Sequence, residues 1–405
     1  MPRLSAAAVP AAAMLAACGA APSLRPATLD PKTAASIQVG VVGGVARFCP
    51  GGAAVQLDVA VATTDGRVLD SWSSGEGRAG RLPFSTFEWT TSWGAVDGDG
   101  FVRLPDDPLA AIGRTVAIEV RVAERPDLRG QVTLTPDFGC GGSVGGSGIA
   151  GTSGFGGSSG APGAGGRADD GSHGAETGQR GGPGDHGSHG GDGGPGPAVV
   201  AWLGYVETGG ERLAILRARV HGQVQTAVFD PAGEPWAVVA FGGQGGSGGR
   251  GGDGGPGGTG GAGRAPTSGS SGSGSGSSEG DPGTDGGDGG DGGQGGDGGD
   301  GGDGGPGGGL ELTYDAAFPE LATLVVTDTR GGAAGDGGYP GGGGQGGSGG
   351  TGARRGRDGQ PGAAGRSGSD GREGAPGTAP VVRAGDIRAA FSDLGERGLV
   401  LAAPR

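Results

Sequence analysis

The stretch GGDGGDGGQGGDGGDGGDGGPGGG, residues 286–309, decides much of the fold, because glycine fills two of every three positions and aspartate most of the third. A period of three matches the polyproline II geometry, which rises about 3.1 Å per residue and forms no hydrogen bonds within itself. The backbone groups of such a segment must bond to water or to neighbouring segments. Where such helices pack side by side, the inward position has no room for a Cβ atom, so glycine must recur every third residue.

The same period recurs in three glycine-rich blocks, residues 141–197, 242–309 and 331–378. Prolines keep the phase of the glycines, whereas a plain flexible linker needs no phase. We therefore expect packed polyglycine II helices, with solvated disorder and a collagen-like trimer as the alternatives. A monomer is favoured over the trimer, because proline is sparse and many triplets carry a second glycine. Prolines that precede a phased glycine include Pro162, Pro183, Pro195, Pro256, Pro306, Pro340 and Pro361.

Composition excludes several functions. The 405 residues include 109 glycines, only 4% are aromatic, and the formal net charge is -14. An acidic chain lacks the basic face that phosphates demand, so we expect no nucleic-acid partner. Lys32 is the only lysine, which removes the phosphate-binding loop that needs a lysine after its glycines.

The first residues carry a targeting signal. Arg3 precedes an apolar run that ends in LAAC at Cys18. This pattern resembles the lipobox of bacterial lipoproteins, and the resemblance implies that residues 1–17 are a signal peptide and that Cys18 is lipidated. The acyl chains would anchor the protein in a lipid bilayer, with residues 18–33 as a tether. Gly19 is compatible with sorting to the outer membrane, facing the periplasm or the outside.

Residues 34–140 predict an antiparallel β-sandwich. About seven short segments alternate apolar and polar residues with period two, and turn sequences such as TTDGR and DGDG separate them. Cys49 and Cys140 bracket this region, and a location outside the cytoplasm permits a disulfide between them. Closing a loop of this length stabilises a chain by about 4 to 5 kcal/mol in the chain-entropy model. Two free buried thiols are the alternative.

Three apolar pieces lie between and after the blocks, namely 198–241, 310–330 and 379–405. The first reads as β-hairpins, the second as a β piece, and the third as a β piece with a short helix around DIRAAFSDL. The two later pieces are too short to fold alone, since an isolated hairpin is marginal in water. We expect all three to assemble into a second small β-domain, so the fold class is all-β with glycine-rich polyglycine II insertions.

The charged residues of the blocks suggest contacts between helices rather than catalysis. Aspartates recur in one phase of the opening stretch, and arginines recur in the last block. Adjacent antiparallel helices could match these charges and fix their order, although exposed ion pairs contribute only about 0 to 1 kcal/mol each. The aspartates are Asp288, Asp291, Asp297, Asp300 and Asp303. The arginines are Arg354, Arg355, Arg357, Arg366 and Arg372.

No catalytic or cofactor-binding residue is predicted. His173, His186 and His189 lie among aspartates, which makes a weak transition-metal site conceivable. However, His186 and His189 would be one turn apart, about 9 Å, which is too far to share an ion. We therefore predict no metal and no cofactor.

The glycine pattern resembles the glycine-rich domain of Obg GTPases, springtail antifreeze proteins and glycine-rich phage adhesins. The lipobox and the repeats together resemble collagen-like and glycine-rich surface lipoproteins. The resemblance implies a non-enzymatic structural or adhesive module with an unknown surface, protein or glycan partner. The alternative is a carbohydrate- or small-ligand-binding module in the sandwich, with Trp72, Trp89 or Trp93 as stacking platforms.

Overall fold

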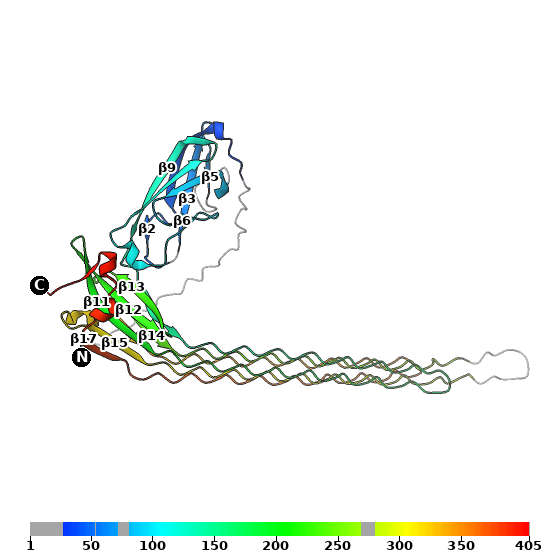
Figure 1. The fold of residues 1–405 in the computed structure, drawn as a ribbon. Coiled ribbons are helices and arrows are strands. Elements are labelled where there is room, and N and C mark those ends of the chain that lie inside the picture. Colours follow the sequence, from blue (N-terminus) through cyan, green and yellow to red (C-terminus); the bar gives the residue numbers. More distant parts are fainter. Residues whose placement is uncertain (1–26, 53, 72–80, 269–279, 405) are drawn as a thin grey trace, which may run out of the picture. The chain divides into compact units, whose positions relative to one another are not determined.

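The protein is all-β. The computed structural model describes residues 27–52, 54–71, 81–268 and 280–404 (Figure 1). The predicted signal peptide and Cys18 lie outside these residues. The chain divides into a first unit, Met1–Asp106 with Arg114–Asp137, and a second unit, Asp107–Gly113 with Phe138–Arg405.

The first unit contains two sheets, and every pairing in them is antiparallel except that of β2 with β9. The five-stranded sheet has the order β1-β3-β7-β6 with β4 beside β3; its strands are β1 (Ala34–Val41), β3 (Val55–Thr63), β4 (Val68–Asp70), β6 (Ala95–Val96) and β7 (Phe101–Arg103). The four-stranded sheet has the order β2-β9-β8-β5; its strands are β2 (Arg47–Phe48), β5 (Phe87–Thr91), β8 (Val116–Val122) and β9 (Arg125–Pro136). Two short 3-10 turns accompany them, η1 (Pro31–Thr33) and η2 (Phe84–Thr86).

Alternation of side chains produces the core of this unit. In β3, Leu57, Val59 and Val61 are fully buried, while the residues between them are partly exposed. Val120 of β8 and Phe87 of β5 belong to the same apolar cluster. The arrangement fits the predicted β-sandwich, and the predicted disulfide is confirmed, since Cys49 and Cys140 are both disulfide-bonded.

The second unit contains two further sheets. The six-stranded sheet has the order β13-β12-β11-β15-β17 with β18 beside β11; its strands are β11 (Val199–Thr208), β12 (Glu211–Val220), β13 (Gln223–Phe229), β15 (Leu310–Asp315), β17 (Val381–Gly385) and β18 (Val400–Leu401). The three-stranded sheet has the order β10-β14-β16; its strands are β10 (Ser143–Ser147), β14 (Trp236–Phe241) and β16 (Val325–Asp328). The 3-10 turns are η3 (Pro108–Ala111), η4 (Pro319–Thr323), η5 (Arg388–Phe391) and η6 (Gly395–Arg397).

Strand β10 lies inside the segment that the sequence analysis assigned to the first glycine-rich block. It pairs in parallel with β14, with Ser143 opposite Ala237. Val144 is its apolar residue and is only 5% exposed, within the main core cluster of the unit. A single valine among glycines and serines is too weak a signal for a strand, and the neighbouring β14 provides the pairing. The helix expected around residues 386–394 is a single 3-10 turn, η5, and η6 follows this segment.

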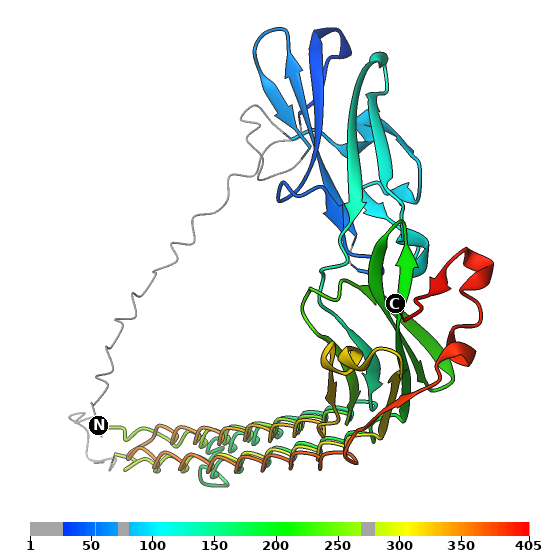
Figure 2. The same ribbon diagram turned by 90° about the vertical axis from the view of Figure 1, so that its left-hand side faces the viewer.

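Six glycine-rich runs extend from these sheets (Figures 1 and 2). They have neither helix nor strand assignment, yet they lie side by side and are joined by backbone hydrogen bonds along their length. We number them in chain order: run 1 (148–169), run 2 (176–196), run 3 (242–263), run 4 (284–308), run 5 (330–351) and run 6 (354–377).

The two sheets set the order of the runs. Runs 1, 3 and 5 follow directly from the parallel strands β10, β14 and β16, and they form one layer in that order, here called the odd layer. Runs 2, 4 and 6 lead directly into the parallel strands β11, β15 and β17, and they form the second layer, the even layer. Each layer of runs is therefore the continuation of a sheet. Runs are parallel within a layer and antiparallel between layers.

Candidate functional site: the two faces of the glycine-rich bundle

The hydrogen bonds of run 4 show how the layers are joined. The Gly292 N–H donates to the Gln360 carbonyl of run 6 (2.8 Å), and the Gly293 N–H donates to the Gly255 carbonyl of run 3 (2.8 Å). Carbonyls of run 4 accept from Gly181 of run 2 (2.9 Å) and Gly344 of run 5 (2.9 Å). The same pattern repeats every three residues, so each run is fixed by its neighbours rather than by bonds within itself.

The number of neighbours explains the number of glycines. Run 4 touches four other runs, and a Cβ on Gly292 would lie 2.0 Å from the Gly344 carbonyl oxygen, while one on Gly293 would lie 1.9 Å from that of Gly182. Run 4 therefore needs two glycines per triplet. Run 6 touches only runs 4 and 5, and it keeps one glycine per triplet with two exposed side chains between, as in Ala363 and Ala364. Run 1 follows the same rule at the opposite edge.

The third position of run 4 carries the aspartates, and their carboxylates accept backbone hydrogen bonds. The Gln360 N–H donates to Asp291 Oδ1 (2.8 Å) and the Arg366 N–H donates to Asp297 Oδ1 (2.7 Å). These amides of run 6 are the ones that no carbonyl of the bundle reaches. Aspartate in the opening stretch thus supplies the acceptor that the main chain lacks. Four further carboxylates do the same: Asp285 for Arg354, Asp288 for Arg357, Asp300 for Ser369 and Asp303 for Arg372.

Run 2 supplies acceptors to run 4 in the same way. Nδ1 of His186 accepts from the Asp297 N–H (3.0 Å), and Nδ1 of His189 accepts from the Asp300 N–H (3.1 Å). In the next triplet, Asp192 Oδ1 accepts from the Asp303 N–H (2.8 Å). Imidazole and carboxylate are therefore interchangeable as acceptors at this seam. All three bonds span 111 residues, and the sequence analysis missed this role because it depends on which runs become neighbours.

The expected matching of arginines and aspartates on antiparallel helices is wrong in its details. Runs 4 and 6 are neighbours, but they are parallel, because successive glycines of run 4 bond to successively later residues of run 6. The aspartates of run 4 meet the backbone amides of the arginines. Among the described residues of runs 4 and 6, the ion pair is Arg355–Asp358 at 3.0 Å, within run 6 itself. Register comes from main-chain bonds, which need no charge.

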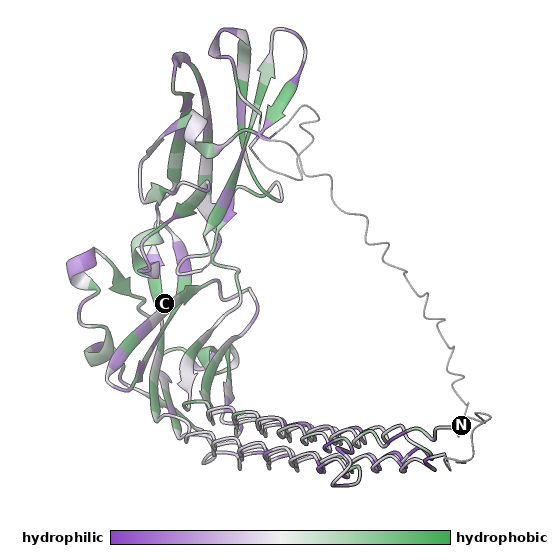
Figure 3. Ribbon diagram, turned by 90° about the vertical axis from the view of Figure 1, so that its right-hand side faces the viewer, coloured by the Kyte–Doolittle hydropathy of each residue, from purple (hydrophilic) through white to green (hydrophobic). Residues whose placement is uncertain are grey.

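The outward surfaces of the two layers differ in chemistry. The even face carries the rows of aspartate, histidine and arginine just described. The odd face carries mainly small or neutral side chains, with Arg250 and Asp253 paired to each other at 3.0 Å. Exposed third-position residues of runs 3 and 5 include Gln244, Ser247, Pro256, Thr259, Ala333, Asp336, Tyr339, Gln345 and Ser348. Figure 3 shows the runs mostly white and purple, whereas the strands carry strongly green segments.

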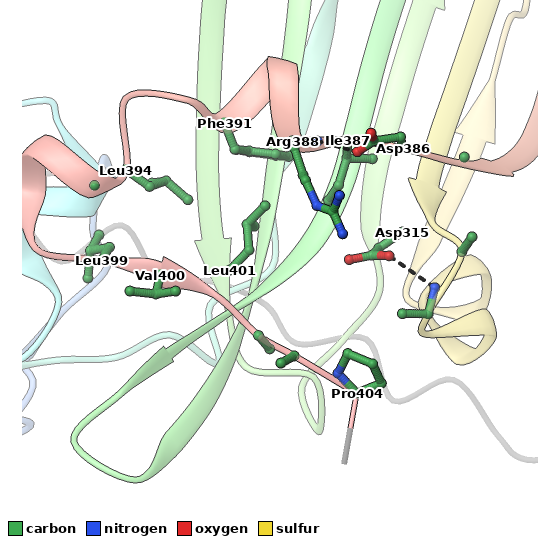
Figure 4. Close-up of a pocket in the computed structure, with 16 residues that line it drawn as sticks. Asp315, Asp386, Ile387, Arg388, Phe391, Leu394, Leu399, Val400, Leu401 and Pro404 are labelled. Atoms are coloured by element: carbon green, nitrogen blue, oxygen red, sulfur yellow. Dashed lines mark hydrogen bonds between the residues drawn. The ribbon is translucent and has the colours of Figure 1, made fainter.

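A second feature of this unit is a groove of about 820 Å³ beside the ends of β15 and β17 (Figure 4). Ile387 and Phe391 line it and are 2% and 3% exposed, whereas Val400, which also lines it, is 68% exposed. Asp315 Oδ1 accepts from the Ala317 N–H (3.0 Å) and Asp386 Oδ1 from the Arg388 N–H (3.0 Å). Both carboxylates therefore stabilise turns, and the groove brings together no nucleophile and base.

The first unit contains a pair of aspartates that the sequence analysis did not single out. Asp58 lies on β3 and Asp70 at the end of the neighbouring β4. Burial, followed by the negative charge of Asp70 and a hydrogen bond with it, raises the pKa of Asp58 to about 6. Asp58 therefore favours its protonated form more than an ordinary aspartate does, and the signal in the sequence was the aspartate within VQLDVAV.

The sequence analysis also named three tryptophans as stacking platforms for a ligand. Trp72 lies outside the described residues. Trp89 is half-buried against Phe84 and Phe87, with ring centroids 6.1 and 6.0 Å away. Trp93 is half-buried, packs on Phe48 at 6.2 Å and lies beneath the Arg114 guanidinium.

Within the described part of the chain, no group of three or more histidine, cysteine, aspartate or glutamate residues could hold a metal ion. His173 instead lies 3.4 Å from its neighbour Asp170. Within the same residues, no helix has the length and apolar character needed to cross a membrane.

No protein-family model matches the chain, and no curated protein or solved structure does either.

Proposed function

We propose that the protein is a non-enzymatic lipoprotein of the bacterial cell envelope, anchored through Cys18, in which a bundle of polyglycine II helices acts as a structural or adhesive module. The observation that carries the proposal is the six-run, two-layer hydrogen-bond pattern, which holds side chains in regular rows on two outward faces. Rows of this kind suit contact with an extended surface better than capture of a small molecule. The bundle would be the projecting part, and the partner a surface, a protein or a glycan.

Three observations support polyglycine II geometry for the runs. Hydrogen bonds recur every third residue, which is the number of residues per turn of that helix. Among the described glycines of run 4 between 286 and 308, none has a positive φ, in keeping with the left-handed form. All these bonds join different runs, as expected for a helix without internal hydrogen bonds. At about 3.1 Å per residue, run 4 would be about 75 Å long.

The direction of the runs supports a monomer. A collagen triple helix needs three parallel chains, whereas here neighbouring runs of opposite layers are antiparallel and all six belong to one chain. Each run has its glycine side filled by other runs of the same molecule. The runs therefore leave no unfilled glycine side against which the other chains of a trimer could pack.

The disulfide of Cys49 and Cys140 supports a location outside the cytoplasm. An outer-membrane position follows from the lipobox that ends at Cys18 and from Gly19 after it. The bilayer is then a partner through the acyl chains alone. The half-buried state of Trp89 and Trp93 gives no particular support to the alternative of a carbohydrate-binding sandwich.

The test combines anchoring, assembly and adhesion in one set of variants. Full chain, Cys18→Ser and Gly296→Ala would be expressed with the leader in a host that lipidates proteins. We expect palmitate labelling of the full chain and of Gly296→Ala, none of Cys18→Ser, and a monomer by light scattering after size exclusion. Cells that display the full chain should attach to glass or immobilised polysaccharides better than cells with either variant.

A trimeric or expanded chain would refute the bundle, and labelling of Cys18→Ser would refute the anchor. Equal attachment of cells that display the full chain and Gly296→Ala would refute adhesion by the bundle.

A further inference from the structure

Run 2 places three equivalent acceptor side chains along its contact with run 4. Two of them are histidines and one is an aspartate. His186 and His189 accept the amides of Asp297 and Asp300 through Nδ1, and Asp192 accepts the amide of Asp303 through a carboxylate oxygen. All three bonds have lengths between 2.8 and 3.1 Å and join the same two runs. Only the chemistry of the acceptor differs along this seam.

The backbone amides that donate to Nδ1 determine the tautomer of both neutral imidazole rings. A backbone N–H can only donate, so Nδ1 of each ring must carry a lone pair and the proton of the neutral ring must sit on Nε2. A carboxylate keeps its lone pairs throughout the mildly acidic range, whereas an imidazole gains a second proton there. The two kinds of acceptor therefore respond differently to acid.

We infer that His186 and His189 make the seam between runs 2 and 4 sensitive to protons. A proton taken from solvent binds Nδ1, the same atom that accepts the amide, and two N–H groups then point at each other. Each ring must leave the amide, and a carboxylate lies within reach, Asp297 Oδ2 at 3.8 Å from His186 and Asp300 Oδ2 at 3.4 Å from His189. Both side chains are 75% exposed, so solvent protons reach them directly.

The surrounding charges favour this exchange of partners. Run 4 offers the carboxylates of Asp297 and Asp300, and run 2 itself carries Asp185 and Asp192. The carboxylate of Asp185 bonds to the hydroxyl of Ser158 in run 1. Run 3 carries Arg250 and Asp253 along this segment, paired with each other at 3.0 Å. Run 6 carries Arg366 and Arg372, whose amides bond to Asp297 and Asp303.

The effect extends beyond the seam, because Asp297 and Asp300 also accept the amides of Arg366 and Ser369 in run 6. A charged imidazole that takes over these carboxylates competes with the bonds that tie run 6 to run 4. Acid would then loosen the even layer at two adjacent triplets while Asp192 holds the third. The even face also gains two positive charges.

The test is hydrogen exchange on the full chain, read at single residues by mass spectrometry with electron-transfer fragmentation. The protection of the Asp297 and Asp300 amides, each corrected for its intrinsic rate and divided by that of Asp303, would be compared at about pH 7.5 and about pH 5. We expect the ratio to fall by about fivefold to tenfold in acid, as for the loss of one modest hydrogen bond. In His186→Asp with His189→Asp, which copies Asp192, the ratio should stay constant.

An unchanged ratio in the full chain would overturn the inference, whether the rings fail to titrate or keep their bonds when charged. A fall of equal size in the double variant would also overturn it, since the cause would then lie outside the imidazoles. Protection of the Gly292 and Gly293 amides of run 4, which donate to Gln360 and Gly255 and lie remote from both histidines, reports whether each variant is folded.

Discussion

At the scale of the residue, each position of a triplet has its own physical requirement. Glycine stands where a Cβ would strike a carbonyl of the next run, as at Gly293. Aspartate stands where an amide of the next run lacks a carbonyl partner, as Asp291 does for Gln360. In the opening stretch, glycine therefore allows the runs to approach closely, and aspartate satisfies the amides that this packing leaves without a carbonyl.

Residue chemistry also decides the pH response of the first unit, through Asp58. Its pKa is raised from 3.8 to about 6 by burial and by Asp70. The folded state therefore favours the protonated form. The resulting stability is fully present below about pH 4 and is lost as the pH rises through about 6.

We predict that Asp58→Asn removes this part of the pH dependence. Asparagine keeps the size of the side chain and can still donate to Asp70, but it carries no charge to bury. The variant should match the natural chain near pH 4 and be the more stable of the two above pH 6. Thermal unfolding followed at several pH values measures the difference. Asp106→Asn, an exposed aspartate of the same unit, should leave the curve unchanged; parallel curves for Asp58→Asn would contradict the assignment.

At the scale of the element, the neighbours of a run determine its composition. Runs 3 and 4 touch four runs each and carry two glycines per triplet, while runs 1 and 6 lie at the edges and carry one. Ordering glycine costs more conformational entropy than ordering any other residue. The edge runs therefore carry few glycines beyond those that contact demands, and their other side chains leave no room for a seventh run.

This rule predicts opposite effects for the same substitution at two glycines. Gly296→Ala puts a methyl group 1.9 Å from the Asp185 carbonyl oxygen, so runs 2 and 4 must separate, at a cost of about 1–3 kcal/mol or more. Gly156→Ala in run 1 meets nothing nearer than 3.6 Å, and it should stabilise by about 0.4–1 kcal/mol because the unfolded chain loses freedom. Denaturant unfolding of both variants gives the two free energies. Similar losses at both sites would show that the contact rule does not govern the runs.

Sequence reasoning reached the class of each element but not the way in which the elements combine. Apolar–polar alternation with period two predicted strands in the regions of β3 and β8, and the glycine repeat with period three predicted the glycine-rich blocks. Both patterns are visible within a short stretch of sequence. Strand β10 escaped, since Val144 alone carries its apolar signal and its partner β14 lies almost 100 residues on. The amide-accepting role of Asp291 and His186 escaped for the same reason. It depends on which runs become neighbours, and that is decided by the sheets.

At the scale of the whole molecule, two sheets and two layers share one order. The strand order β10-β14-β16 becomes the run order 1-3-5, and β11-β15-β17 becomes 2-4-6. Burial of apolar side chains in the strands, with Leu203 and Leu312 fully buried, stabilises the order of the runs, which glycine alone would not specify. Each long excursion starts and ends on a fixed strand, so its register is set at the base.

The disulfide stabilises the chain at this same scale. Replacing both cysteines, Cys49→Ser with Cys140→Ser, frees a loop of roughly 90 residues and should lower the free energy of unfolding by about 4 to 5 kcal/mol. Fluorescence of Trp89 and Trp93 during denaturant unfolding would report the shift. A reductant should reproduce the loss in the natural chain and do nothing further to the double variant. An unshifted midpoint in either experiment would show that the bond is stabilising nothing.

One feature of the bundle bears on how the protein ages. Aspartate followed by glycine is a sequence prone to cyclise: the glycine nitrogen attacks the side-chain carboxyl, water leaves, and addition of water to the resulting ring yields an isomerised backbone. The chain repeats this dipeptide throughout run 4. There the Gly292 nitrogen donates to the Gln360 carbonyl, while the Gln360 amide holds the Asp291 carboxylate. Nucleophile and target are both tied to run 6, so the bundle protects its most fragile bonds for as long as it stays folded.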